Sequence, residues 1–133
     1  MQRIAKKHCI TEDDAILSST SLLHGPVGAV VAGEVYGITD VDILHAIACH
    51  TTGEPEMSPL DMVVWLSDKI EPTRTSYPAL EEIRSLAQDS LPKALLAALK
   101  NSQRHVHNQG KTLHPMTEKT IQWLQSAEER DLK

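Results

Sequence analysis

The feature that most restricts the fold of this 133-residue sequence is a helix signal that begins at Ser58 and ends before Pro72. Ser58 can accept a hydrogen bond as the N-cap, Pro59 suits the first helical position, and Asp61 stands three residues after the cap. Pro72 cannot continue a helix and biases the residue before it away from helical geometry. The pattern therefore predicts a helix that ends near Ile70.

An acidic residue is expected on the apolar side of this helix. Leu60, Val64 and Asp68 recur at intervals of four residues, so they are predicted to share one face. A buried carboxylate near the C-terminal end of a helix dipole needs a cation close by. Lys69, Arg74 or a metal ion could supply the positive charge. A partly exposed acid or an ordinary ion pair is the alternative interpretation.

A second unusual residue is the histidine that precedes this helix. Asp40 can cap a helix that reaches His50, and Gly53 is suitably placed as its C-terminal stop. Ile43, Ile47 and His50 follow the i, i+4, i+7 pattern, which predicts that His50 faces the core. His50 is then either a metal ligand or a core histidine whose hydrogen bonds are satisfied.

Helix signals continue through the rest of the chain. Pro26 is placed to open a helix that ends near Tyr36, with Gly37 as its stop, which puts His24 at a helix entrance. The small residues of segment 25–33 indicate close helix packing, because they lack the lysine and spacing of a phosphate-binding loop. Further helices are predicted over 2–8, after a cap at Thr11, from Pro78, from Pro92 to Gly110, and over 118–127 after a cap at Thr117. No alternating strand pattern is present, so the sequence predicts a single all-α domain over residues 1–133.

Composition excludes several classes of function. The net charge of −5 and the two Trp and two Tyr without Phe argue against nucleic acid as a partner. Cys9 and Cys49 are too few for a disulfide scaffold or a thiolate zinc site. No apolar run reaches the length of a membrane span and no signal peptide precedes the first helix, so a cytoplasmic location is expected.

Five short motifs occur in a characteristic order. They are Leu22-Leu23-His24-Gly25-Pro26-Val27-Gly28-Ala29, His50-Thr51-Thr52-Gly53, Met57-Ser58-Pro59-Leu60, Ser67-Asp68-Lys69-Ile70-Glu71-Pro72-Thr73-Arg74, and Leu113-His114-Pro115-Met116-Thr117. In these motifs the chain resembles the bacterial HD-domain family of symmetrical dinucleoside-tetraphosphate hydrolases, the YqeK group. The resemblance covers residues 21–124 and implies an HD-domain-like helical bundle.

The resemblance also implies a site and a reaction. His24, His50 and Asp68 match metal ligands of a two-metal site, and Thr51, Thr52, Gly53, Lys69 and Arg74 match the surroundings of the substrate. Imidazole and carboxylate ligands suit iron, manganese or cobalt better than calcium, and iron is the expected divalent metal. The implied reaction is the symmetrical cleavage of diadenosine tetraphosphate, a dinucleoside polyphosphate, into two ADP. His114 matches a family motif, but the sequence indicates no physical role for it.

One departure from the family pattern leaves alternatives open. The family's His-Asp pair precedes the LLHG segment, and this chain contains no His-Asp dipeptide. The chain is therefore expected to be the C-terminal part of an N-terminally truncated HD domain. It is a phosphohydrolase, a non-catalytic nucleotide-binding or regulatory module, or an interaction scaffold whose exposed core is covered by a second subunit in a homodimer.

Overall fold

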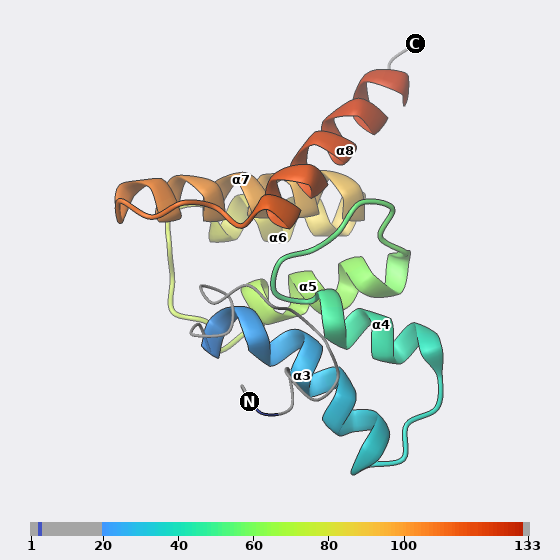
Figure 1. Ribbon diagram of the computed structural model, residues 1–133. Coiled ribbons are helices and arrows are strands. Elements are labelled where there is room, and N and C mark those ends of the chain that lie inside the picture. Colours follow the sequence, from blue (N-terminus) through green and yellow to red (C-terminus); the bar gives the residue numbers. More distant parts are fainter. Residues whose placement is uncertain (1–2, 4–19, 132–133) are drawn as a thin grey trace. The chain divides into compact units, whose positions relative to one another are not determined.

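The computed structural model describes residues 3 and 20–131, and residues 20–131 form helices joined by loops, without a strand (Figure 1). The helices are α3 (Thr20–Glu34), α4 (Val41–Cys49), α5 (Pro59–Ile70), α6 (Leu80–Asp89), α7 (Leu91–Asn108) and α8 (Pro115–Asp131). The predicted all-α class is confirmed. The helices expected over 2–8 and after Thr11 lie outside the described residues.

The chain divides into two compact units. The first extends to Thr52 and contains α3 and α4, and the second begins at Gly53 and contains α5 to α8. The single domain expected over residues 1–133 stays a prediction. None of the described helices combines the length and the apolar character needed to cross a membrane.

Helix α3 starts earlier than the sequence predicts. It begins at Thr20 and continues through Pro26, which lies inside the helix, so the expectation that Pro26 opens it is wrong. An interior proline removes one backbone hydrogen bond and crowds the preceding turn. Leu23 and Val27 are one turn apart and both buried, and their burial favours a continuous helix across the proline. His24 consequently lies within α3 rather than at its entrance.

Helix α4 is capped as predicted, but its buried face differs. The Asp40 carboxylate accepts hydrogen bonds from the backbone N–H groups of Asp42, at 2.9 Å, and Ile43, at 3.4 Å. The buried residues of α4 are Ala46 and Cys49, whereas Ile43 is 42% exposed and His50 is half-buried, so the predicted stripe of Ile43, Ile47 and His50 is not the buried face. Small side chains on the buried face let a neighbouring backbone approach closely, which a stripe of isoleucines would prevent.

Helix α5 has the boundaries that the sequence predicts. Ser58 accepts a hydrogen bond from the Asp61 N–H at 3.1 Å, and the Asp61 carboxylate accepts one from the Ser58 N–H at 3.0 Å. This reciprocal pair is a capping box. The helix ends at Ile70, immediately before the C-cap Glu71.

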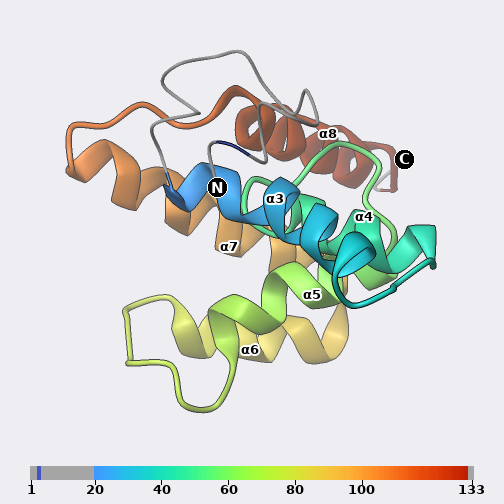
Figure 2. The same cartoon turned by 60° about the horizontal axis from the view of Figure 1, so that its bottom comes forward.

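The core of the second unit is built around α7. Figure 2 shows α6 beside α7, and both α5 and α8 also contact α7. Its buried apolar residues include Trp65, Leu66, Leu80, Ile83, Leu95, Leu99, Ile121 and Leu124. Ser90 caps α7 as an N-cap, and Gly110 follows its end with a φ of +71°.

Helix α8 begins at Pro115, so the prediction that Thr117 caps it is wrong. The Nδ1 atom of His114 accepts a hydrogen bond from the Met116 N–H at 3.0 Å, and Thr117 is buried inside the helix. A ring nitrogen thus satisfies a backbone donor that helix geometry leaves without an intrahelical partner. This is the physical role of His114 that the sequence did not indicate.

Candidate functional site

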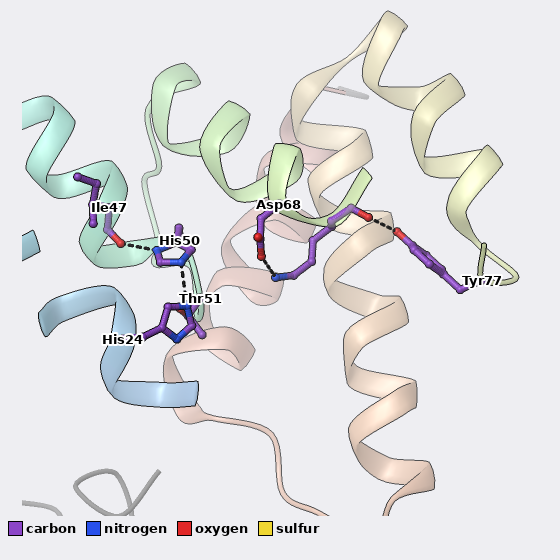
Figure 3. Close-up of polar contacts among 7 residues, drawn as sticks. His24, Ile47, His50, Thr51, Asp68 and Tyr77 are labelled. Carbon is purple, nitrogen blue, oxygen red and sulfur yellow. Dashed lines mark hydrogen bonds and ion pairs between the residues drawn. The ribbon is translucent and has the colours of Figure 1, made fainter. Parts of the chain in front are cut away.

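The two histidines of the predicted metal site meet in the first unit. The Nε2 atoms of His24, on α3, and His50, the C-cap of α4, are 2.9 Å apart. Their ring centroids are 4.7 Å apart and the rings meet edge to face at 72°. Figure 3 shows the two side chains pointing toward each other. Two residues that are 26 positions apart in sequence therefore present the same ring atom to one point.

The orientation of the His50 ring is fixed by the backbone. Its Nδ1 atom lies 2.5 Å from the carbonyl oxygen of Ile47, and a carbonyl can only accept, so Nδ1 carries the proton. The lone pair of a neutral His50 is then on Nε2, the atom that faces His24. Metal-binding histidines commonly donate their second nitrogen to a carbonyl in this way, which orients the ring.

A hydroxyl group completes this cluster. The Thr51 Oγ1 atom lies 3.2 Å from His24 Nε2, directly after the C-cap of α4 (Figure 3). Thr51 was expected near the substrate, and the structure brings it together with His24 and His50. His24 is exposed and His50 is half-buried.

A glycine allows the histidines to approach each other. A Cβ atom at Gly25 would lie 2.7 Å from the backbone oxygen of Ala48 and 3.2 Å from Thr51 Oγ1. In proteins a Cβ atom essentially never lies within 3.0 Å of a nonbonded heavy atom. The absence of a side chain at Gly25 therefore lets the His24 turn of α3 lie against the last turn of α4. The predicted close helix packing of segment 25–33 is confirmed at this position.

The donor set fits a divalent transition metal. Two nitrogen ligands about 2.1 Å from one ion lie about 3 Å apart when they meet it at a right angle, close to the separation of the two Nε2 atoms. Neutral imidazole nitrogens suit iron and zinc, whereas calcium and magnesium prefer oxygen. His24 and His50 are thus suited to hold such an ion.

Of the two interpretations of Asp68 that the sequence left open, the structure shows the partly exposed acid in an ordinary ion pair. Its side chain is 53% exposed and forms an ion pair with Lys69, whose Nζ atom lies 2.9 Å from Asp68 Oδ2. Lys69 Nζ also lies 4.9 Å from the ring centroid of Trp65, a cation–π distance. The buried carboxylate of α5 belongs to Asp61, which is 2% exposed and serves the N-terminal cap. Asp68 is seven residues after Asp61 and so shares its side of α5, but it lies in the last turn of the helix, after the last buried residue, Leu66.

The C-terminal end of α5, which carries Asp68, is held by two residues that the sequence did not identify. The Tyr77 hydroxyl donates to the Lys69 carbonyl at 2.9 Å (Figure 3), and burial raises the pKa of this hydroxyl. The Arg84 guanidinium donates to the carbonyl oxygens of Ile70, at 3.1 Å, and Glu71, at 3.0 Å. These carbonyls have no partner within the helix. No short-range sequence signal links Arg84 to residues 13 and 14 positions earlier.

The loop after α5 contains Arg74, another predicted site residue, and is ordered by contacts of Glu71. The hydroxyl and the backbone N–H of Thr73 both donate to Glu71 Oε2, at 2.5 Å and 2.8 Å, and they lower the pKa of the Glu71 carboxyl below 4.5. Arg74 is exposed, and its backbone N–H donates to the Glu71 carbonyl at 3.0 Å. Its side chain is accessible to an anionic ligand.

The remaining predicted residues are partly or fully buried. Thr52 is half-buried, and Gly53 is buried with a φ of +73°, a conformation that favours glycine. A Cβ atom at Gly53 would lie 3.3 Å from the Thr120 side chain and 3.6 Å from Met57 Sδ. Gly53 therefore has a structural reason to be glycine, whether or not it borders a substrate.

Comparison with known proteins defines the class of protein. No protein-family model matches the chain. A crystal structure described as a predicted HD superfamily hydrolase involved in NAD metabolism, from Clostridium acetobutylicum, superposes with a TM-score of 0.88 and 36% identity. The match covers 94% of this chain and 66% of that one. The chain thus has an all-α fold of the HD-domain type.

Curated relatives narrow this class. The symmetrical bis(5'-nucleosyl)-tetraphosphatase of Bacillus subtilis is 39% identical over 105 residues, which are 79% of this chain and 56% of that protein. The protein of the same name from Halalkalibacterium halodurans is 36% identical over 115 residues, which are 86% of this chain and 61% of that protein. The chain therefore spans little more than half the length of these relatives. By sequence and fold it is related to the HD-domain family of symmetrical tetraphosphatases, and the resemblance seen in the sequence is confirmed.

Proposed function

We propose that the chain acts as a divalent-metal-dependent phosphohydrolase that cleaves diadenosine tetraphosphate symmetrically into two ADP. The observation that carries the proposal is the pair of Nε2 atoms of His24 and His50, 2.9 Å apart, one of them oriented by a backbone carbonyl. The names of the curated relatives support the reaction and its substrate. Iron is the proposed metal, with manganese and cobalt as alternatives, because imidazole and carboxylate ligands together suit these ions.

The proposed roles follow from the contacts of each residue. His24, His50 and Asp68 would hold the metal, and the Ile47 carbonyl keeps the His50 ring in the ligating tautomer. When bound, such an ion activates water and neutralises charge on phosphate oxygens. Lys69 and Arg74 bind the polyphosphate, and Thr51, Thr52 and Gly53 border the substrate. Water adds to an inner phosphorus atom, the central bridging P–O bond breaks, and one proton is released.

The experiment is an assay of ADP release from diadenosine tetraphosphate by the purified 133-residue chain in the presence of manganese(II) or iron(II). We expect ADP as the sole nucleotide product and a loss of at least about 100-fold in kcat in His50→Ala, in the range seen when catalytic groups are removed. His107→Ala is the matched control, since His107 is exposed on α7 and outside the predicted site. A chain without turnover, or one whose turnover survives His50→Ala, would contradict the proposal.

The substrate-binding roles need a separate measurement. Lys69→Ala and Arg74→Ala should each raise KM by about tenfold, because each removes a cation that contacts phosphate. Lys111→Ala is the control, since Lys111 is an exposed cation in the turn after α7. Equal KM values in all variants would remove Lys69 and Arg74 from the proposed site.

A further inference from the structure

Helix α7 carries a row of cations that the proposed reaction does not use. Lys93, Lys100 and Arg104 are spaced by seven and four residues, which places them on one face of the helix over about 16 Å. Lys93 and Arg104 are exposed and Lys100 is half-buried. Within the described part of the chain, none of the three forms an ion pair.

These cations line three neighbouring hollows in the second unit. Lys93, Lys100 and Arg104 all line a hollow of about 320 Å³ among α6, α7 and α8. It shares Lys93 and Leu96 with a hollow of about 470 Å³ at one end, and Arg104 and Glu82 with a hollow of about 420 Å³ at the other. We call these three hollows together the α7 groove. Each hollow has the volume of a small-molecule site.

The two ends of the α7 groove differ in chemistry. The end beyond Lys93 is mainly apolar and is lined by Met57, Met62, Trp123 and Leu124. Methionine and tryptophan side chains at such a site suit a planar ring. The end beyond Arg104 is lined mostly by residues that carry polar groups, among them Tyr77, Asn101, His105 and Asn108.

Two carboxylates restrict the class of ligand. Glu82 and Glu128 line the central hollow with the three cations, so the groove is not uniformly positive. A long polyanion would meet both carboxylates and be repelled. A molecule with one anionic end and several hydroxyl or amino donors would use the cations and the carboxylates together.

We propose that the α7 groove binds a nucleoside phosphate, with the base in the apolar hollow and the phosphates beside Lys100 and Arg104. In this arrangement Glu82 and Glu128 accept hydrogen bonds from the ribose hydroxyls and from the exocyclic amine of the base. This inference goes beyond the proposed hydrolysis, because it assigns a nucleotide site to α6, α7 and α8 and requires no metal.

The test is calorimetric titration of the intact chain with ADP in EDTA. The double variant Lys100→Glu/Arg104→Glu should bind ADP at least about tenfold more weakly, because two phosphate contacts are replaced by repulsion. The matched control is Lys111→Glu/Lys119→Glu, which makes the same charge change at exposed positions outside the groove. Its affinity should equal that of the unchanged chain. Circular dichroism checks that both variants keep their helix content.

Titrations with adenosine and with pyrophosphate test the contacts of the base and of the phosphates separately. Adenosine and inorganic pyrophosphate should each bind more weakly than ADP, and Trp123→Ala should weaken ADP and adenosine but not pyrophosphate. Absence of ADP binding, equal ADP affinities in the two double variants, or pyrophosphate binding as tight as that of ADP would each overturn the proposal. His50→Ala should retain ADP binding in EDTA even though it loses hydrolysis. The titration therefore tests the α7 groove independently of the proposed hydrolysis.

Discussion

The separation of the two histidines depends on the missing side chain of Gly25. Gly25→Ala places a Cβ atom 2.7 Å from the Ala48 carbonyl oxygen, and backbone must move to relieve the contact. We expect a loss of about 1 to 3 kcal/mol in unfolding free energy, as for other overpacking changes, measured by urea denaturation. The control is Gly28→Ala, whose Cβ would meet Ile47 at an ordinary 3.6 Å. Since alanine favours helix over glycine, this control should be neutral or stabilising. Equal stability of the two variants would contradict the packing argument.

A second residue-level prediction concerns backbone strain in the loop before α5. Glu56 has a φ of +63°, in the left-handed region that costs a residue with a Cβ atom about 1 kcal/mol. Glu56→Gly should therefore raise the thermal unfolding midpoint, because glycine adopts this conformation without the clash. Glu56→Ala keeps the Cβ atom and serves as the control. If both changes shift the midpoint equally, the effect comes from the carboxylate and not from the backbone.

At the level of the helix, His114 is predicted to stabilise the start of α8. Its Nδ1 atom accepts the Met116 N–H, so His114→Ala leaves that donor without its partner. The expected cost is about 1 kcal/mol, the usual value for an N-cap, measured by denaturant unfolding. His114→Asn supplies another side-chain acceptor and should recover most of the loss. Loss of stability in both variants would mean that the imidazole acts through packing instead.

The C-terminal end of α5 gives a pH-dependent prediction. Thr73 hydrogen bonds lower the pKa of the Glu71 carboxyl, so this group stabilises the fold above pH 4.5 and the contribution is lost as the pH falls through the lowered pKa. Thr73→Val removes the hydroxyl donor, and the pKa of Glu71 should move up toward 4.5. A carboxyl titration by NMR measures the shift, with Thr75→Val as the control. An unchanged Glu71 pKa in Thr73→Val would contradict the assignment of the shift to this hydroxyl.

The reciprocal capping box of Ser58 and Asp61 predicts a helix start correctly, whereas the single signals at Pro26 and Thr117 do not. Ser58, Pro59 and Asp61 act on one another within four residues, so the start of α5 follows from the sequence. Pro26 is also a local signal, but the burial of Leu23 and Val27 outweighs its cost and α3 continues across it. The burial of side chains on a short helix depends on what packs against it, which explains why Ile43 was placed wrongly.

At the level of the whole molecule, the site is less predictable than the helices. Spacing alone does not indicate that His24 and His50 meet, since they are 26 residues apart, and the resemblance to a known family is what paired them. Spacing also left Asp68 open between a buried carboxylate and an ordinary ion pair, and the contact with Lys69 shows the ion pair. Tyr77 and Arg84 stabilise the C-terminal end of α5 by donating to backbone carbonyls of distant residues, and such contacts leave no pattern in the sequence.

Metal binding should stabilise the whole chain if His24 and His50 are ligands. A ligand that binds only the folded state adds about 2.7 kcal/mol at a concentration 100 times its Kd, so the unfolding midpoint should rise with manganese(II) concentration. The rise should disappear in EDTA and in His50→Ala, which removes one of the two facing Nε2 atoms. It should persist in His107→Ala, because that exposed histidine lies on α7 outside the predicted site. Thermal unfolding across a metal titration checks this, and an equal rise in His50→Ala would show that manganese stabilises the fold through other residues.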